Sequence, residues 1–124
     1  KKNKEEKQLI FDDKNLYNIN GESVYIQICN VSPKELKPFS DKIKAVVKSV
    51  VIVLVTNFKQ KSTVVISLTK NLTKEYSALI MVKKISAFLG GKGGGGKEDM
   101  AQGGGLEIKK VEPLKEYIKS LFNS

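Results

Sequence analysis

The residues of this chain that could do chemistry are concentrated in one stretch, residues 90–105, which reads GGKGGGGKEDMAQGGG. It holds nine of the ten glycines of the 124-residue chain. Because glycine lacks a Cβ, such a stretch lets another molecule approach the main chain and lets backbone N–H groups face outward. Lys92 and Lys97 can neutralise phosphates, and the amide of Gln102 can donate and accept hydrogen bonds. We therefore predict an ordered binding loop rather than an inert linker.

A nucleotide-binding loop is one alternative for the same residues. Residues 91–97 fit the pattern G-x-x-x-x-G-K of the phosphate-binding loop. The next residue is Glu98, however, where a serine or threonine should supply a hydroxyl to Mg²⁺. That loop also leaves a strand and opens a helix, whereas this one is expected to leave a helix. We therefore expect no nucleotide site, and no cofactor of any kind.

The elements that must position the glycines alternate along the chain. Apolar residues at helical spacing predict a helix from about Ser77 that ends at Gly90 as its left-handed cap. The other expected elements are a strand over residues 23–31, a helix that follows Ser32-Pro33 and contains Pro38, a hairpin of residues 50–58 and 63–68, and a final helix over residues 111–122. The predicted fold class is α/β: a small mixed β-sheet of three to five strands covered by two or three helices, with a glycine-rich loop after the second helix.

Composition limits the range of functions. The net charge is +9, and all 22 basic residues are lysines, which favours long-range attraction to a polyanion over base-specific reading by arginine. A lysine-rich solvated surface is the alternative interpretation. The phenylalanines at positions 39, 58, 88 and 122 occupy apolar-face positions and are predicted to be core residues rather than base-stacking platforms.

Catalysis, metal binding and membrane insertion are not indicated. The chain has no histidine and a single cysteine, Cys29, which a strand would half-bury; this composition excludes the usual zinc sites and a disulfide within the chain. The adjacent Glu98 and Asp99 should point apart, so they form no acid–base pair. We therefore expect no metal and no catalytic residue in this chain itself. A single reduced thiol, no signal peptide and no long apolar run predict a cytoplasmic protein without membrane contact.

The glycine stretch resembles a known signature. Residues 90–104 are similar to the pattern GG-x-GGG-(R/K)-P-D-x-AQ-x-GG of the C-terminal, DHH-associated domain of alanyl-tRNA synthetases. Residues 36–41 (LKPFSD) and 69–73 (TKNLT) also resemble segments of that family, so the resemblance extends from about residue 20 to 122. The chain departs from the pattern by an extra glycine, Gly96, and by Glu98 in place of proline, which loosens the turn and adds a negative charge.

The resemblance implies a domain division. Residues 1–20 would be the end of a linker or coiled-coil helix followed by a turn at 18–21, and residues 21–124 the DHH-associated domain. Because the chain begins with a charged lysine-rich segment and no methionine, we expect it to be cut from a longer protein.

The resemblance also implies an RNA-binding function. The expected partners are tRNA specific for alanine, contacted at the elbow where the D and T loops meet, and the rest of the synthetase chain with its aminoacylation and editing domains. The expected RNA-binding residues are Gly91, Lys92, Gly93, Gly94, Gly95, Gly96, Lys97, Asp99, Gln102, Gly103 and Gly104, with Lys83 and Lys84 as supporting cations.

Two other functions stay open at this point. One is the substrate-binding half of a DHH-type phosphoesterase that acts on oligonucleotides or cyclic dinucleotides; those proteins favour a shorter glycine motif with a histidine, which this chain lacks. The other is an oligomerisation module, in which the N-terminal segment and the final helix pair with other copies of the chain. The second is compatible with RNA binding.

Overall fold

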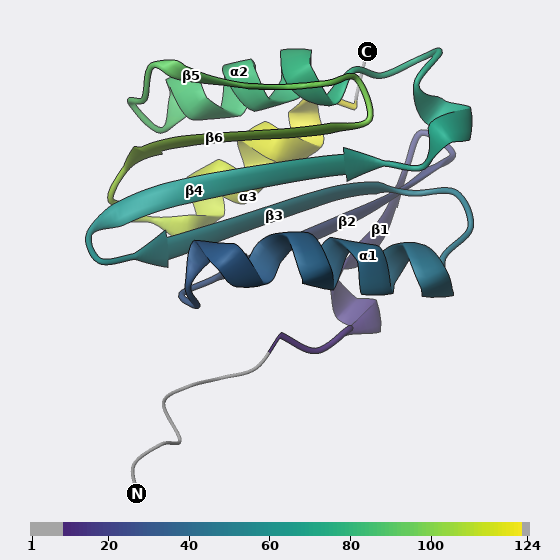
Figure 1. Ribbon diagram of the computed structural model, residues 1–124, viewed down its shortest axis with the longest axis horizontal. Coiled ribbons are helices and arrows are strands. Elements are labelled where there is room, and N and C mark those ends of the chain that lie inside the picture. Colours follow the sequence, from purple (N-terminus) through teal and green to yellow (C-terminus); the bar gives the residue numbers. More distant parts are fainter. Residues whose placement is uncertain (1–8, 123–124) are drawn as a thin grey trace, which may run out of the picture.

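The computed structural model describes residues 9–122, which form one six-stranded sheet with helices on both faces (Figure 1). The strands are β1 (Leu16–Ile19), β2 (Glu22–Cys29), β3 (Val51–Phe58), β4 (Lys61–Leu68), β5 (Gly93–Gly96) and β6 (Met100–Leu106). The helices are α1 (Leu36–Val46), α2 (Ala78–Phe88) and α3 (Val111–Ser120), with 3₁₀ turns at Asp13–Asn15, Pro33–Glu35 and Lys70–Leu72. The α/β class and the three helices are as predicted; the sheet has six strands rather than three to five.

The sheet is mixed, with the strand order β1-β2-β3-β4-β6-β5. Only β2 and β3 are parallel, and α1 makes the crossover between them. All other neighbours are antiparallel. β3 and β4 are runs of β-branched residues buried on both faces, as expected of central strands.

Two hydrophobic clusters hold the helices to the sheet. On one face, α1 packs Leu36, Phe39 and Ile43 over Ile52 and Leu54 of β3. On the other face, α2 and α3 cover the alternate residues of the same strands. The result is three layers, with α1 on one side of the sheet and α2 and α3 on the other (Figure 1). Within residues 9–122, no helix has the length and apolarity needed to cross a bilayer.

The first strand was missed in the sequence. Residues 18–21 were predicted to be a turn, but only Asn20 and Gly21 form it, with φ of 52° and 84°. Leu16–Ile19 pairs with β2 in an antiparallel hairpin and so belongs to the sheet. Of the predicted linker helix, residues 1–8 lie outside the described part of the chain, and Asp13–Asn15 forms a 3₁₀ turn.

The helix after Ser32-Pro33 is split near its start. Pro33–Glu35 forms a separate 3₁₀ turn, and α1 begins at Leu36, so that Pro38 lies in its first turn, where a missing N–H costs nothing. The predicted helix of residues 77–90 is confirmed: the Ser77 side chain accepts a hydrogen bond from the Ile80 N–H, and Gly90 has a φ of 82°.

The β3–β4 turn offers a stability test. Lys59 and Gln60 both have positive φ, 54° and 66°, which a two-residue type I′ turn requires and which side-chain-bearing residues adopt at a cost. We expect Gln60→Gly to raise the free energy of unfolding by about 1 kcal/mol. Urea denaturation measures this, and an unchanged midpoint would mean that the turn carries no strain.

Candidate nucleic-acid interface

The glycine stretch is a β-hairpin rather than the predicted loop. Gly93–Gly96 forms β5, which pairs antiparallel with β6, and β6 in turn pairs with β4. In the described part of the chain, β5 is the last strand of the sheet and has no neighbour on its outer side. Because antiparallel residues alternate, and because the Lys97 N–H donates to the Met100 carbonyl at 2.7 Å, the N–H groups of Gly94 and Gly96 are directed to this free edge.

The buried Ser86 of α2 ties the hairpin to the helix. Its hydroxyl accepts a hydrogen bond from the Gly93 N–H at 3.1 Å and donates one to the Gly104 carbonyl, so it bridges the two strands. The Ser86 carbonyl accepts from the Gly91 N–H at 2.8 Å. The sequence did not point to Ser86, because nothing in its spacing distinguishes it from the other residues of an amphipathic helix.

The close packing of the stretch against its own backbone, β4 and α2 explains most of the glycines. A Cβ on Gly91 would lie 1.9 Å from the Gly104 oxygen, and a Cβ on Gly105 would lie 2.5 Å from the Leu89 Cβ. Gly93 and Gly96 have positive φ, 106° and 144°, which favours glycine. The stretch is therefore glycine-rich partly for packing, a reason that does not depend on any ligand.

The hairpin turn is held by its backbone. The Glu98 carbonyl accepts a hydrogen bond from the Ala78 N–H at 2.8 Å, and the Asp99 carbonyl accepts one from the Leu68 N–H at 2.9 Å. Because a proline also has a carbonyl, Glu98 keeps the contact that the family's proline could make, while its side chain is exposed. Beside this turn lies a cavity of about 540 Å³ lined by Lys70, Thr73, Leu79 and residues 96–99.

The two faces of the hairpin differ sharply. Ala101 and Gly103 face α2, since Ala101 belongs to the cluster beneath α2 and a Cβ on Gly103 would lie 3.3 Å from a Val82 methyl carbon. The alternate residues point to the side of α1, beyond the strands that α1 covers. We call these residues the glycine face: Gly93, Gly95, Gln102 and Gly104.

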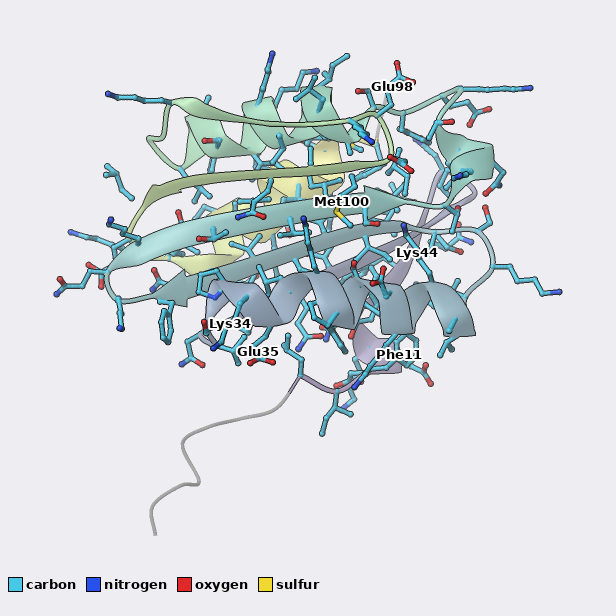
Figure 2. The ribbon with its side chains drawn as sticks, viewed as in Figure 1. Phe11, Lys34, Glu35, Lys44, Glu98 and Met100 are labelled. Atoms are coloured by element: carbon cyan, nitrogen blue, oxygen red, sulfur yellow. The ribbon has the colours of Figure 1, made fainter. Side chains whose placement is uncertain are left out.

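The structure brings most of the predicted residues together. Gln102 is exposed at the centre of the glycine face, directly opposite Gly95. Lys92 and Lys97 are exposed and immediately precede and follow β5, so one ammonium group stands at each end of the strand. Asp99 is half-buried in the turn, and Met100, which the sequence did not single out, is the next α1-side residue of β6 (Figure 2).

Lys83 and Lys84 lie apart from this group. They are exposed on α2, which covers the opposite face of the sheet. The Lys84 carbonyl accepts a hydrogen bond from the Tyr117 hydroxyl of α3 at 3.5 Å. A nucleic acid would have to pass around the β5 edge to reach both these lysines and Gln102.

The prediction of core phenylalanines is confirmed for Phe39 and Phe122, whereas Phe58 and Phe88 belong to neither hydrophobic cluster. Phe39 and Phe122 are buried and Phe58 is partly buried, but Phe88 is 46% exposed. Phe88 stacks on Tyr117 of α3, with ring centroids 4.5 Å apart. The helical spacing predicted Phe88 on the buried side of α2, but it is the last residue of that helix and packs against α3 instead of into the core.

Cys29 is a structural residue. Burial raises the pKa of its thiol above the ordinary value. Hydrogen bonds with the Val31 backbone and the Thr56 side chain lower this pKa, but they have a smaller effect than burial. Its sulfur donates to the Val55 carbonyl at 3.5 Å. A raised pKa keeps the thiol protonated at neutral pH, and a protonated thiol is a poor nucleophile.

The order of elements speaks against a nucleotide-binding loop. Residues 91–97 leave helix α2, form the edge strand and enter a hairpin turn, whereas the phosphate-binding loop of nucleotide hydrolases connects a strand to the first turn of a helix. The expected order of elements, in which the glycine stretch leaves a helix, is confirmed.

Comparison with known proteins gives a consistent result. Residues 20–124 match the DHHA1 domain family. The chain is 42% identical over 91 residues, 73% of its length, to an alanine–tRNA ligase of Chelativorans sp. strain BNC1, and 44% identical over 92 residues, 74% of its length, to that of Paramagnetospirillum magneticum. Each match covers 10% of the relative, so the chain spans about a tenth of the length of these proteins.

A solved structure has the same fold. The C-Ala domain of Aquifex aeolicus alanyl-tRNA synthetase superposes with a TM-score of 0.78, over 88% of this chain and 98% of that one, at 24% sequence identity.

Proposed function

Because the chain belongs to the DHHA1 domain family, we propose that it binds tRNA through the glycine face and the two ends of β5. Its relatives of known name are alanine–tRNA ligases, and a tRNA is the macromolecular substrate that such a name states. The net charge of +9, composed of lysines alone, supports attraction to a polyanion.

The observation that carries the proposal is the glycine at position 95. Each of the other eight glycines of the stretch has either a positive φ or a neighbouring atom within about 3.3 Å of where a Cβ would stand. Gly95 has neither: a Cβ there would meet nothing within 4 Å. The fold does not require a glycine at this position, so its bare backbone is suited to the close approach of a second molecule.

The surroundings of Gly95 suit a nucleic acid. Gln102 directly across can donate to and accept from a 2′-hydroxyl or a base edge, and the outward N–H groups of Gly94 and Gly96 can donate to phosphate oxygens. Lys92 and Lys97 supply charge at both ends of the strand. No aromatic side chain belongs to the glycine face, which favours recognition of a folded RNA by shape over stacking of single-stranded bases.

The proposed ligand is tRNA specific for alanine, held at its elbow, as the family resemblance implies. In the longer protein, this contact would keep one tRNA bound while its acceptor end moves between the aminoacylation and editing sites. The proposal assigns no catalytic residue and no cofactor to this chain, and it places the protein in the cytoplasm with the other components of translation.

A substitution at Gly95 tests this proposal. We expect Gly95→Val to weaken tRNA binding at least about tenfold, because the new side chain holds the nucleic acid away from the backbone, while the free energy of unfolding stays within about 0.5 kcal/mol of the parent value. Filter binding with an alanine tRNA transcript and urea denaturation measure the two quantities. Full tRNA affinity in a folded Gly95→Val protein would remove the glycine face from the RNA contact, and a parent chain that binds no tRNA would end the proposal itself.

A further inference from the structure

We propose that one flank of α1 forms a second phosphate-binding strip beside the glycine face, made of Lys37 and Lys44. This inference rests on the proposed RNA binding and extends its surface from β5 across the sheet to the helix on the same side. The residues of the strip were not among those predicted from the sequence.

The packing of α1 fixes which flank borders the glycine face. Leu36, Ser40 and Ile43 are buried beneath the helix, and Phe39 meets the Tyr25 ring of β2 edge to face at a centroid distance of 6.1 Å. The Phe39 flank therefore faces β2 and β1. Residues about 140–160° around the helix from Phe39, on the Ser40 side, must face the other way, toward β4 and β6, and at 100° per residue these are Lys37 and Lys44.

The Lys44 side chain agrees with this assignment. It is partly buried, and it extends from α1 toward the side of the sheet on which Met100 of β6 lies (Figure 2). Lys37 precedes it by seven residues, two turns of helix, so it lies on the same flank about 10.5 Å further along the axis. The two ammonium groups form a row along the helix.

Within residues 9–122, the α1-side strand residues between this row and β5 include no acidic side chain. The α1-side residues of β4 are Lys61, Thr63, Val65 and Ser67, and those of β6 are Met100, Gln102, Gly104 and Leu106. Glu98 and Asp99 are confined to the turn at one end. Cations thus border this surface on two sides, Lys37 and Lys44 on the helix and Lys92 and Lys97 at the strand, and Lys61 adds a further cation on the surface itself, an arrangement that suits a phosphate backbone laid across it.

Asp41 is a carboxylate of α1 close to the row. It is exposed on α1, four residues after Lys37 and three before Lys44, which places it within reach of both ammonium groups. It lowers the positive potential of the strip. A nucleic acid bound there should therefore bind more tightly when this charge is removed.

Salt-dependent tRNA binding tests the strip. We expect the Lys37→Ala/Lys44→Ala protein to bind alanine tRNA about tenfold more weakly. The magnitude of the slope of log affinity against log salt should fall by about 1.4–1.8, because two phosphate contacts are lost. Asp41→Asn should bind about twofold more tightly. The control is Lys42→Ala/Lys115→Ala, with the same change in net charge; Lys42 is exposed on the Phe39 flank of α1 and Lys115 is on α3. It should keep the parent slope and an affinity within about twofold.

Two further comparisons separate the outcomes. Lys44→Gln keeps the first two of the four methylene groups of this partly buried residue and a polar end. The same loss of slope in a Lys37→Ala/Lys44→Gln protein with a parent-like unfolding midpoint therefore excludes a folding defect. If the strip variants have the same tRNA affinity and salt slope as the Lys42/Lys115 control while Gly95→Val still weakens binding, the strip does not contact the RNA and the proposed function stands. If the parent chain binds no tRNA at all, both fail.

Discussion

Gly91→Ala is expected to destabilise the protein by about 3 kcal/mol or more, enough to unfold a large share of a marginally stable domain. The added methyl would lie 1.9 Å from the Gly104 carbonyl oxygen and 2.7 Å from the Ser86 hydroxyl oxygen. Neither neighbour can yield cheaply, because the first is backbone within a strand and the second is the bridge that joins β5, β6 and α2. Urea denaturation followed by far-ultraviolet circular dichroism measures the loss.

Gly95→Ala is the matched control for that experiment. It places the same methyl on the same hairpin four residues later, where a Cβ meets nothing within 4 Å and φ is not positive. Its unfolding free energy should equal that of the parent within about 0.5 kcal/mol, or rise slightly as the unfolded chain loses freedom. Equal stability of the two variants would contradict the packing of the hairpin on α2.

The two glycine positions show how far the sequence alone can go. Nine glycines in sixteen residues indicate that another group lies close to the main chain, but they do not identify that group. At Gly91 the approaching group is the protein's own strand, whereas at Gly95 the backbone is open. The distinction depends on the register of β5 against β6 and on the position of Ser86, both set by contacts between separate elements that no single segment's pattern specifies.

Patterns within single segments predicted most of the helices and strands, but not the two edge strands of the sheet, β1 and β5. The helical spacing before Gly90 and its positive φ, and the β-branched runs of β3 and β4, are properties of single segments. Strand β5, by contrast, consists of four glycines, which have low strand propensity and form a strand here only because β6 and α2 hold them. Strand β1 did carry a signal: Asn20-Gly21 is a favoured two-residue hairpin turn, and treating it as the end of a linker missed the strand before it.

The sequence identified most of the candidate residues of the site, but not how the fold arranges them on the two faces of the sheet. Lys92, Lys97 and Gln102 were identified from their places within the motif, and the structure groups them around one face. The position of Lys83 and Lys84 on the far side of the sheet, and that of Lys37 and Lys44 beside the glycine face, follow from which helix covers which face. A helix pattern gives the buried side of each helix but not the strand that its flank borders.

Reversing both lysines at the ends of β5, in a Lys92→Glu/Lys97→Glu protein, is expected to abolish measurable tRNA binding. Each change replaces a cation by an anion beside the outward N–H groups of Gly94 and Gly96, so the net charge falls by four and the phosphates meet repulsion at both ends of the strand. Neutral Lys92→Ala/Lys97→Ala should retain weak binding, with about 1.4–1.8 removed from the salt slope, since two phosphate contacts are lost.

The charge-matched control for this reversal is Lys110→Glu/Lys115→Glu. It lowers the net charge by the same four units on α3, which covers the opposite face of the sheet, and at the N-cap position of Lys110 a glutamate does not oppose the helix dipole. If general attraction between a basic protein and RNA were the whole interaction, both proteins would lose tRNA equally. We expect the control to lose only the screened, long-range part of the affinity, a few-fold at about 0.1 M salt, because charges separated by more than a Debye length of roughly 10 Å act weakly. Equal losses would assign the binding to net charge and remove β5 from the contact.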